Sequence, residues 1–205
     1  MSDEGSASNR EVRRGSARAK LLAAAAARFY AQGVTASGID VITADAGVAK
    51  MSLYNNFASK SELVAAYLEQ RQQEFRDQQR RRSAALPPNA GPGARVLTVF
   101  DAYIDQAEAS AEFRGCGLLN VAGELAIGDP NRERVSGHKA EVEHLLRDAF
   151  TPRDGDPVAR PVVDADRLAE HLATLLEGAM VRAGLEGSTR RLHRTRELAA
   201  ALLNE

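Results

Sequence analysis

The sequence predicts an all-α protein, with an N-terminal three-helix helix-turn-helix domain, a C-terminal helical bundle domain and about nine helices in total. Three observations lead to this class. Ala, Leu, Arg and Glu dominate the 205 residues, and these are strong helix formers. Trp is absent and aromatic residues make up only 5% of the chain, so residue types that favour strands are scarce. Apolar residues recur at helical spacing, and no alternating strand pattern is seen.

The chain is expected to begin with a polar arm and a first helix. Residues 1–15 are rich in Gly, Ser and Arg and lack periodicity, so a disordered arm is expected there. The first helix is expected from about Ala17 to Gln32, and Gly33 ends it at a position where helices commonly stop. Ser37, followed three residues later by Asp40, has the spacing of a capping box and predicts the start of a second helix.

Two more helices are expected before the first loop. The second helix ends at Gly47, and a short third helix starts near Lys50. Ser59 and Glu62 form a full capping box that opens a long fourth helix. The Pro/Gly-rich stretch 86–94 then predicts a loop.

The second half of the chain is expected to hold five helices. An amphipathic helix follows residue 94, and a second Pro/Gly-rich loop is expected at 151–161. The remaining four helices are expected over 117–127, 130–150, 164–183 and 188–203. The predicted domain boundaries are therefore 16–64 for the helix-turn-helix and 65–205 for the second domain.

Composition and charge restrict the kinds of partner. The single cysteine, Cys116, excludes an intramolecular disulfide framework and a Cys-rich zinc site. No apolar run reaches the roughly 18 residues of a spanning helix, so no membrane partner and a cytoplasmic location are expected. Residues 1–85 carry a net charge of +4 and residues 86–205 a net charge of −5. A basic segment on an acidic body is typical of a nucleic-acid-binding head.

The stretch 39–57 carries the pattern of two short helices around a tight turn. Gly47 lies where the backbone must turn sharply. The positions expected to form the shared core are Ile39, Ile42, Ala46, Val48, Leu53 and Phe57. The positions then expected to face outward are Lys50, Ser52, Tyr54, Asn55 and Asn56, whose groups bond phosphate oxygens and base edges. The alternative is a three-helix core with a polar surface that binds no DNA.

Residues 20–64 resemble the N-terminal domain of the TetR family of bacterial transcriptional regulators, without a gap. The family's first helix is matched by Leu21, Leu22, Ala25, Phe29 and Gly33. Its helix-turn-helix is matched by Ile42, Ala46, Gly47, Val48, Leu53, Tyr54, Phe57 and Lys60. Two positions depart from the pattern. Thr43 adds a hydroxyl at a tight helix contact, and Ala49 removes the N-cap of the recognition helix, which typically costs about 1 kcal/mol.

This resemblance implies roles for the outward residues. Tyr54 and Lys60 would hold phosphates, while Lys50, Ser52 and Asn55 would reach into the major groove. The predicted set of DNA contacts is completed by Asn56, which suits either role, and by Thr35 and Ser37.

The resemblance also implies a four-helix bundle between two subunits, formed by the last two helices. The predicted homodimer interface consists of Leu168, Leu172, Leu175, Gly178, Leu192, Ala199 and Leu202. The alternative is that these helices only cover the core of their own subunit.

An effector pocket is expected in the second domain, where Asn120 and Glu124 lie four residues apart on an otherwise apolar helix. Polar groups in such a place need partners. They are satisfied either by backbone, water or an arginine, or by a ligand in a cavity. The predicted pocket residues are Phe100, Tyr103, Phe113, Cys116, Asn120, Glu124 and Leu175. Cys116 is either a redox-sensing thiol or a small buried cysteine.

No metal, cofactor or catalytic site is expected, because the four histidines have no metal-binding spacing and no catalytic motif occurs. The sequence thus predicts a repressor, not an enzyme, that binds a pseudo-palindromic operator in double-stranded DNA as a homodimer and is released by a small-molecule effector. A DNA-binding protein without an effector pocket, and an all-α enzyme or scaffold, are the alternatives.

Overall fold

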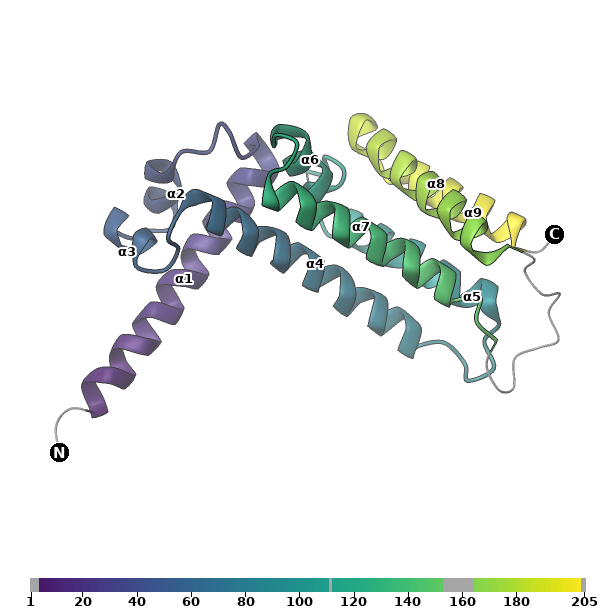
Figure 1. The fold of residues 1–205 in the computed structure, drawn as a ribbon, viewed down its shortest axis with the longest axis horizontal. Helices are drawn as coiled ribbons and strands as arrows, with labels where there is room; N and C mark the ends of the chain where they lie inside the picture. Colours follow the sequence, from purple (N-terminus) through teal and green to yellow (C-terminus); the bar gives the residue numbers. More distant parts are fainter. Residues whose placement is uncertain (1–3, 111, 153–163, 204–205) are drawn as a thin grey trace. The chain divides into compact units, whose positions relative to one another are not determined.

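The structure, a computed structural model, describes residues 4–110, 112–152 and 164–203, with side chains from residue 15 onward (Figure 1). These ranges contain α1 (Glu4–Gln32), α2 (Ile39–Asp45), α3 (Lys50–Tyr54), α4 (Lys60–Ala84), α5 (Pro92–Glu108), α6 (Gly117–Glu124), α7 (Pro130–Asp148), α8 (Ala165–Glu186) and α9 (Arg190–Leu202). They contain no strand. The all-α class is confirmed.

The helices group into two compact units. The first unit comprises residues 1–71 and 117–134, and the second comprises residues 72–116 and 135–205. The short helix α6 therefore belongs with the N-terminal helices, although α5 precedes it in the chain. Whether 16–64 and 65–205 act as separate domains stays a prediction.

The core of the first unit is built around α1, which contacts α2, α3 and α6. Leu21, Ala25 and Phe29 follow one another at four-residue spacing on α1, and all three are buried. The ring of Phe29 meets the ring of Tyr67 edge to face, with 5.7 Å between centroids. Of the predicted core positions in the helix-turn-helix, the buried ones are Ile42, Ala46, Leu53 and Phe57.

The start of α1 differs from the prediction. The helix begins at Glu4 rather than near Ala17, so the predicted disordered arm is wrong for residues 4–15. Extending an existing helix adds one hydrogen bond per residue without a new nucleation cost, and no proline interrupts this stretch. Residues 1–3 lie outside the described part of the chain.

The two predicted capping boxes have different outcomes. At the start of α4, the Ser59 hydroxyl oxygen accepts the Glu62 N–H at 3.1 Å, and Glu62 Oε2 accepts the Ala58 N–H at 2.6 Å, as predicted. At α2 the prediction is wrong. The N-cap is Gly38 without a side-chain bond, because the Ser37 hydroxyl donates to the Gly33 carbonyl at 2.6 Å instead.

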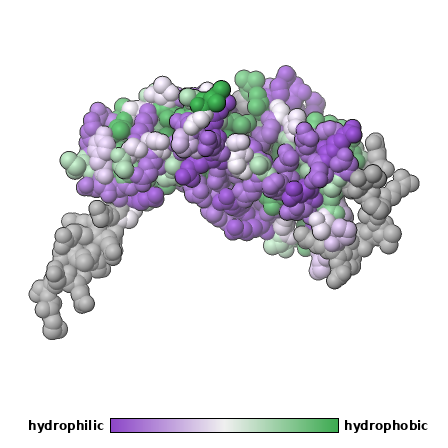
Figure 2. Space-filling model, viewed as in Figure 1, coloured by the Kyte–Doolittle hydropathy of each residue, from purple (hydrophilic) through white to green (hydrophobic). Residues whose placement is uncertain are grey.

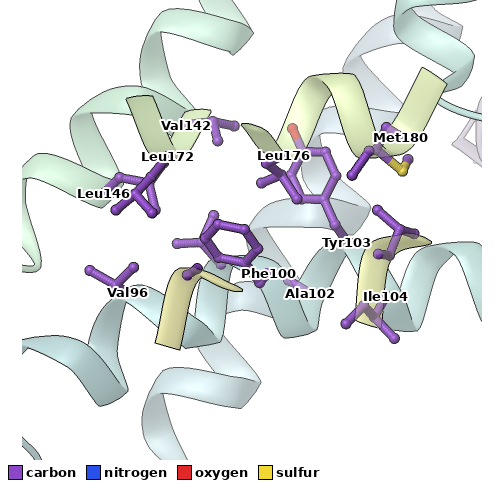
Figure 3. Close-up of a cluster of buried hydrophobic side chains, with 14 of the residues drawn as sticks. Val96, Phe100, Ala102, Tyr103, Ile104, Val142, Leu146, Leu172, Leu176 and Met180 are labelled. Carbon is purple, nitrogen blue, oxygen red and sulfur yellow. The ribbon is translucent and has the colours of Figure 1, made fainter. Parts of the chain in front are cut away.

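The core of the second unit lies among α5, α7, α8 and α9 (Figure 3). Phe100, Leu146 and Leu172 are among its fully buried side chains, and burying each contributes about 1.5–3 kcal/mol. Phe75 of α4 meets the ring of Tyr103 edge to face at 5.2 Å. Phe75 also meets the ring of His138 edge to face at 5.3 Å. The helix α5 is buried along most of its length.

The helices α8 and α9 pack against each other, and α9 also packs against α5. The carboxylate of Asp164 caps α8 by accepting the Arg167 N–H at 3.0 Å. A Cβ atom at Gly184 of α8 would lie 2.5 Å from the backbone nitrogen of Gly115. The segment before α6 therefore approaches α8 backbone to backbone, and this contact requires glycine at position 184.

The visible faces of α4 and α7 are mostly hydrophilic (Figure 2). None of the helices in the described ranges combines the length and the apolar character that a bilayer span requires.

Candidate functional site

The helices α2 and α3 form a helix-turn-helix in the first unit. Between them, Gly47 has φ of 63°, in the left-handed region that favours glycine, as predicted. The Val48 N–H donates to the Thr43 carbonyl at 3.1 Å and ties the turn to α2. Leu53 has no exposed surface, so one face of α3 is fixed against the core. The opposite face of α3 is therefore directed to solvent.

The two departures from the expected pattern have the predicted consequences. Ala49 is the N-cap of α3, with φ −67° and ψ 148°, and no side chain caps the helix. The Thr43 side chain is buried, and its hydroxyl donates to the Asp40 carbonyl at 3.0 Å. Thr43 thus satisfies its hydroxyl within α2, whereas the first turn of α3 lacks a side-chain partner.

The outward face of α3 presents a cation, a thioether, a phenol and an amide. These exposed residues are Lys50, Met51, Tyr54 and Asn55. Met51 is 68% exposed and was missed by sequence reasoning. Helical spacing contains the signal, since a residue two positions before the buried Leu53 lies on the opposite face. An exposed apolar side chain on such a helix suits contact with a thymine methyl group.

Two ion pairs brace the helix-turn-helix at its surface. The Lys50 ammonium lies 2.7 Å from Asp40 Oδ1, and this hydrogen bond and charge raise the pKa of Lys50. The Arg28 guanidinium lies 2.5 Å from Asp45 Oδ2, which joins α1 to the end of α2. Its hydrogen bond holds the pKa of Asp45 below the ordinary value. Both pairs are exposed enough to exchange partners.

Three other predicted DNA contacts are half-buried. The Asn56 Nδ2 donates to the Ser52 carbonyl at 2.7 Å, so part of the Asn56 amide is used within the motif. The Ser52 side chain is half-buried beside it. Lys60 is the first residue of α4 and directly follows the cap Ser59. A cation there lies at the edge of the motif, where a phosphate contact is expected.

Of the predicted contacts Ser37 and Thr35, the first is buried, and the second is exposed but uses its backbone N–H within the first unit. Ser37 is 1% exposed and its hydroxyl bonds to Gly33, so its assignment is wrong. The Thr35 N–H donates to Glu124 Oε2 at 2.7 Å, and the Val34 N–H donates to Glu124 Oε1 at 3.0 Å. Burial raises the pKa of Glu124, but hydrogen bonds from Thr35 and Val34 lower it below the ordinary value overall.

Comparison with family models decides the family. A model described as "Bacterial regulatory proteins, tetR family" matches residues 21–67, which contain the helix-turn-helix. A second model, "Tetracyclin repressor-like, C-terminal domain", matches residues 92–199, more than half of the chain. The chain belongs to the TetR family. It is a DNA-binding transcriptional regulator.

Solved TetR-family structures resemble the chain over most of its length. A regulator from Streptomyces coelicolor has 29% identity and a TM-score of 0.78, covering 93% of this chain and 97% of that one. One from Chloroflexus aurantiacus has 27% identity and a TM-score of 0.79, covering 94% and 96%. A third, described as putative, from Streptomyces avermitilis has 32% identity and a TM-score of 0.66, covering 89% and 97%. No curated protein matches the sequence.

The predicted effector residues of this TetR-family chain fall into both units. Asn120 and Glu124 lie in the first unit, whereas Phe100, Tyr103, Phe113, Cys116 and Leu175 lie in the second. Because the Glu124 carboxylate accepts backbone N–H groups, the alternative of backbone satisfaction holds for it. Phe100 is part of the packed core, and Leu175 is half-buried on α8.

A polar cluster in the second unit surrounds Lys139, which sequence reasoning missed. The Lys139 ammonium donates to Glu177 Oε1 at 2.7 Å, to the Tyr103 hydroxyl at 3.1 Å and to Cys116 Sγ at 3.4 Å. The Tyr103 hydroxyl also donates to Glu177 Oε1 at 3.1 Å. Lys139 and Glu177 are polar positions in amphipathic helices, a pattern that does not distinguish them from solvated surface residues.

The cluster is held in a defined protonation state. Burial lowers the pKa of Lys139, but the surrounding Cys116, Tyr103 and Glu177 raise it by more, so the pKa is raised overall and the ammonium persists. Burial raises the pKa of Tyr103, so the phenol keeps its proton. Nearby, burial and then the Lys139 charge lower the pKa of His138 to about 4. His138 is therefore a neutral core histidine at pH 7.

A groove of about 800 Å³ runs between α7 and α8 in the second unit, and Lys139 and Glu177 both line it. Its other lining residues are Ser136, Ala140, Glu143, Ala173, Thr174, Gly178, Val181 and Arg182. This volume suits a drug-sized ligand. The groove, rather than the packed core beneath it, is the candidate effector site.

A second cavity of about 270 Å³ lies beside Arg95, near the C-terminal end of α7. Arg95 is buried and donates to the carbonyls of Ala149, Ala90 and Thr151, at 3.0, 2.8 and 3.0 Å. The guanidinium therefore binds loop backbone, and its role is structural.

The predicted dimer residues divide into fully buried positions and positions that are half-buried or exposed. Leu172, Leu192 and Ala199 are at most 1% exposed and form the core of their own subunit, so their assignment to an interface is wrong. Leu168 and Leu175 are half-buried, whereas Gly178 and Leu202 are exposed. The exposed large apolar side chains of these helices are Val181, Leu185, Leu198 and Leu202.

No group of three or more metal-ligating side chains lies close enough together to hold a metal ion in the described ranges. The imidazole of His193 lies 2.8 Å from a Glu108 carboxylate oxygen, at the surface.

Proposed function

We propose that this TetR-family regulator is a repressor that binds a pseudo-palindromic operator as a two-fold dimer and is released by a small-molecule effector. The observation that carries the proposal is the outward face of α3. Lys50, Tyr54 and Asn55 are exposed together on a helix whose other face is buried. Such a helix enters the major groove, where cations and amides bond base edges.

The dimer is supported by two matching stripes on α8 and α9. Each stripe follows spacings of four, three and four residues, comprising Thr174, Gly178, Val181 and Leu185 on α8, and Arg191, Thr195, Leu198 and Leu202 on α9. This is the spacing of helices that pack side by side in bundles. Four large apolar side chains in the stripes are 39–81% exposed in one subunit. A second copy would bury them and provide the second recognition helix.

Release by an effector is supported by the groove between α7 and α8. A ligand bound there favours those conformations of the second unit that bind it most tightly. We propose that these conformations hold the two recognition helices of the dimer at a spacing that no longer matches successive major grooves.

Selection from random duplex DNA tests the operator proposal. The parent protein should select a sequence with two-fold symmetry. If Lys50 contacts a guanine edge, Lys50→Ala should relax preference at one symmetric pair of positions, by roughly 1–3 kcal/mol per contact. Identical sequence preferences for parent and variant would contradict the role of Lys50, and no enrichment of any sequence would contradict operator binding.

Salt titrations test the phosphate contacts. Lys60→Ala should weaken binding to all sequences and reduce the slope of log K against log salt by about one unit, because one neutralised phosphate contributes about 0.9. Tyr54→Phe should weaken binding with little change in slope, since it removes an uncharged donor. A Lys60→Ala protein with unchanged affinity and slope would remove Lys60 from the interface.

Light scattering tests the interface. Leu185→Glu combined with Leu198→Glu would place charges without partners inside the bundle and should give monomers with much weaker operator binding. Ile127→Glu is the matched control, since Ile127 is 94% exposed and lies outside the stripes. A double variant that remains dimeric would place the interface elsewhere.

A further inference from the structure

We infer that the effector carries a cationic N–H donor, such as a protonated amine, on an apolar body, and that Glu143 and Glu177 bind that donor in the groove between α7 and α8. The inference rests on the proposed function, because it names the class of ligand for the release site. It follows from the unequal use of donors and acceptors along the groove.

Glu177 has one satisfied and one unsatisfied oxygen. Its Oε1 accepts hydrogen bonds from Lys139 and Tyr103 at 2.7 and 3.1 Å. Its Oε2 is buried and has no hydrogen-bond partner among the described residues. A buried acceptor without a donor is costly. Because Glu177 lines the groove, and its terminal torsion is soft, a ligand donor placed there can satisfy this oxygen.

Lys139 has no further N–H donor for Glu177 Oε2, and for the same reason it cannot attract an anionic ligand. An ammonium has three N–H donors, and those of Lys139 are directed to Glu177, Tyr103 and Cys116. A ligand carboxylate would have to displace one of these partners. The Lys139–Glu177 pair is neutral as a whole, so the preference of the groove for a ligand depends on which of its other charged groups lack partners.

Those residues are one acid and one base, and they differ in their partners. Glu143 lies one turn after Lys139 on the same face of α7, and no described residue pairs with its carboxylate. Arg182 also lines the groove, but its guanidinium lies 3.5 Å from Glu186. A cationic donor between α7 and α8 therefore meets Glu143 from one side and Glu177 from the other.

The remaining lining fits an apolar body. Ala140, Ala173 and Val181 line a groove of about 800 Å³, large enough for an aromatic or branched ligand. Thr174, Gly178 and Val181 also belong to the proposed dimer stripe, so the second copy would cover the α8 side of the groove. The binding measurements are therefore made on the dimer.

The test compares N-dansylcadaverine, a fluorescent primary amine, with its N-acetyl derivative, which has the same body without the charge. We expect the amine to bind the parent at least about tenfold more tightly, a difference of 1.4 kcal/mol. Glu143→Gln and Glu177→Gln should each lower the affinity for the amine about tenfold and leave that for the acetyl derivative unchanged. Glu170→Gln, an equal charge change on α8 outside the groove, should change neither.

Equal binding of the two probes to the parent, absence of binding by both, or full amine affinity in both glutamate variants would overturn the ligand class. If Glu177→Gln proves unstable because Lys139 loses its partner, Glu143→Gln decides alone. Operator binding in the same samples separates the two proposals. An amine that binds selectively without releasing DNA contradicts release, and a neutral compound that releases DNA while the amine does not bind contradicts the ligand class.

Discussion

In the first unit the charged side chains around the recognition helix lie at the surface, whereas in the second unit a lysine and a glutamate are half-buried together. Lys50 and Asp40 are 55% and 76% exposed, so their ion pair is open to solvent. Lys139 and Glu177 are 18% and 25% exposed, and a phenol and a thiol complete their surroundings. The N···O distance is 2.7 Å in both pairs.

The two ion pairs therefore have equal N···O distances but different energetic consequences. An exposed pair contributes little to stability, so Lys50 can exchange Asp40 for a phosphate or a base at small cost. A half-buried pair has given up part of its hydration, and either partner is costly to leave alone. The first arrangement suits a surface that binds and releases DNA. The second suits a site where a ligand that alters one hydrogen bond changes the energy of the surrounding core.

The largest expected effect comes from breaking the half-buried pair. Lys139→Met should lower the free energy of unfolding by about 3 kcal/mol, the lower end of the range for a buried pair, because Glu177 is left half-buried without its partner. Adding Glu177→Leu should restore most of this loss. Urea denaturation of the single and double variants measures both. The matched surface change Lys50→Met should shift the midpoint hardly at all, and an equal shift in both single variants would abolish the contrast between the units.

The second effect is a pH dependence centred on His138. Its pKa is about 4 in the folded protein and 6.5 ordinarily, so the unfolded chain takes up the proton first as the pH falls. The stabilisation by neutral His138 is complete above pH 6.5, declines between 6.5 and 4, and reaches about 3 kcal/mol of loss near pH 4.

Parallel urea titrations at several pH values check this prediction. His138→Gln should be less stable at neutral pH but should lose less stability on acidification than the parent. His144→Gln, an exposed position on the same helix, should follow the parent curve. A His138→Gln protein with the parent's pH dependence would rule out a depressed pKa at this site.

Sequence reasoning correctly predicted features that depend on residue spacing within one helix. It failed for features that depend on which two segments of the chain pack together. The buried face of α3 follows from the spacing of Leu53 and Phe57, and its uncapped start follows from Ala49. By contrast, Glu124 was assigned to a cavity, although its partners lie about ninety residues earlier in the chain. A period of 3.6 residues identifies apolar faces, but it does not tell which neighbour satisfies a polar group.

The same limit explains the dimer residues. Apolar positions recur all round α8 and α9, so the pattern leaves open which leucines point into the subunit. Packing of α9 against both α5 and α8 and the shared core cluster decide it, burying Leu172 and Leu192 and leaving Leu185 and Leu198 outside. Lys139 and Glu177 lie 38 residues apart, and only the fold brings them together.

A smaller effect is expected from restoring the missing cap of α3. Ala49→Ser should stabilise the protein by about 1 kcal/mol, because residue 49 already has the extended backbone of an N-cap and a serine hydroxyl can accept an N–H of the first turn. Thermal unfolding followed by circular dichroism measures the gain. The same substitution inside α2, Ala44→Ser, should give a slight loss. Equal effects at both positions would show that the cap contributes nothing.

The smallest change tests whether the exposed pair is exchangeable. Asp40→Asn removes the partner of Lys50 and a negative charge near the DNA, so operator affinity should rise several-fold at low salt and the gain should shrink as salt screens it. Fluorescence anisotropy with the selected duplex measures this. In a Lys50→Ala background the same substitution should have a much smaller effect, because no lysine remains to be freed. Equal gains in both backgrounds would mean that Asp40 repels DNA directly and that its pairing with Lys50 does not limit binding.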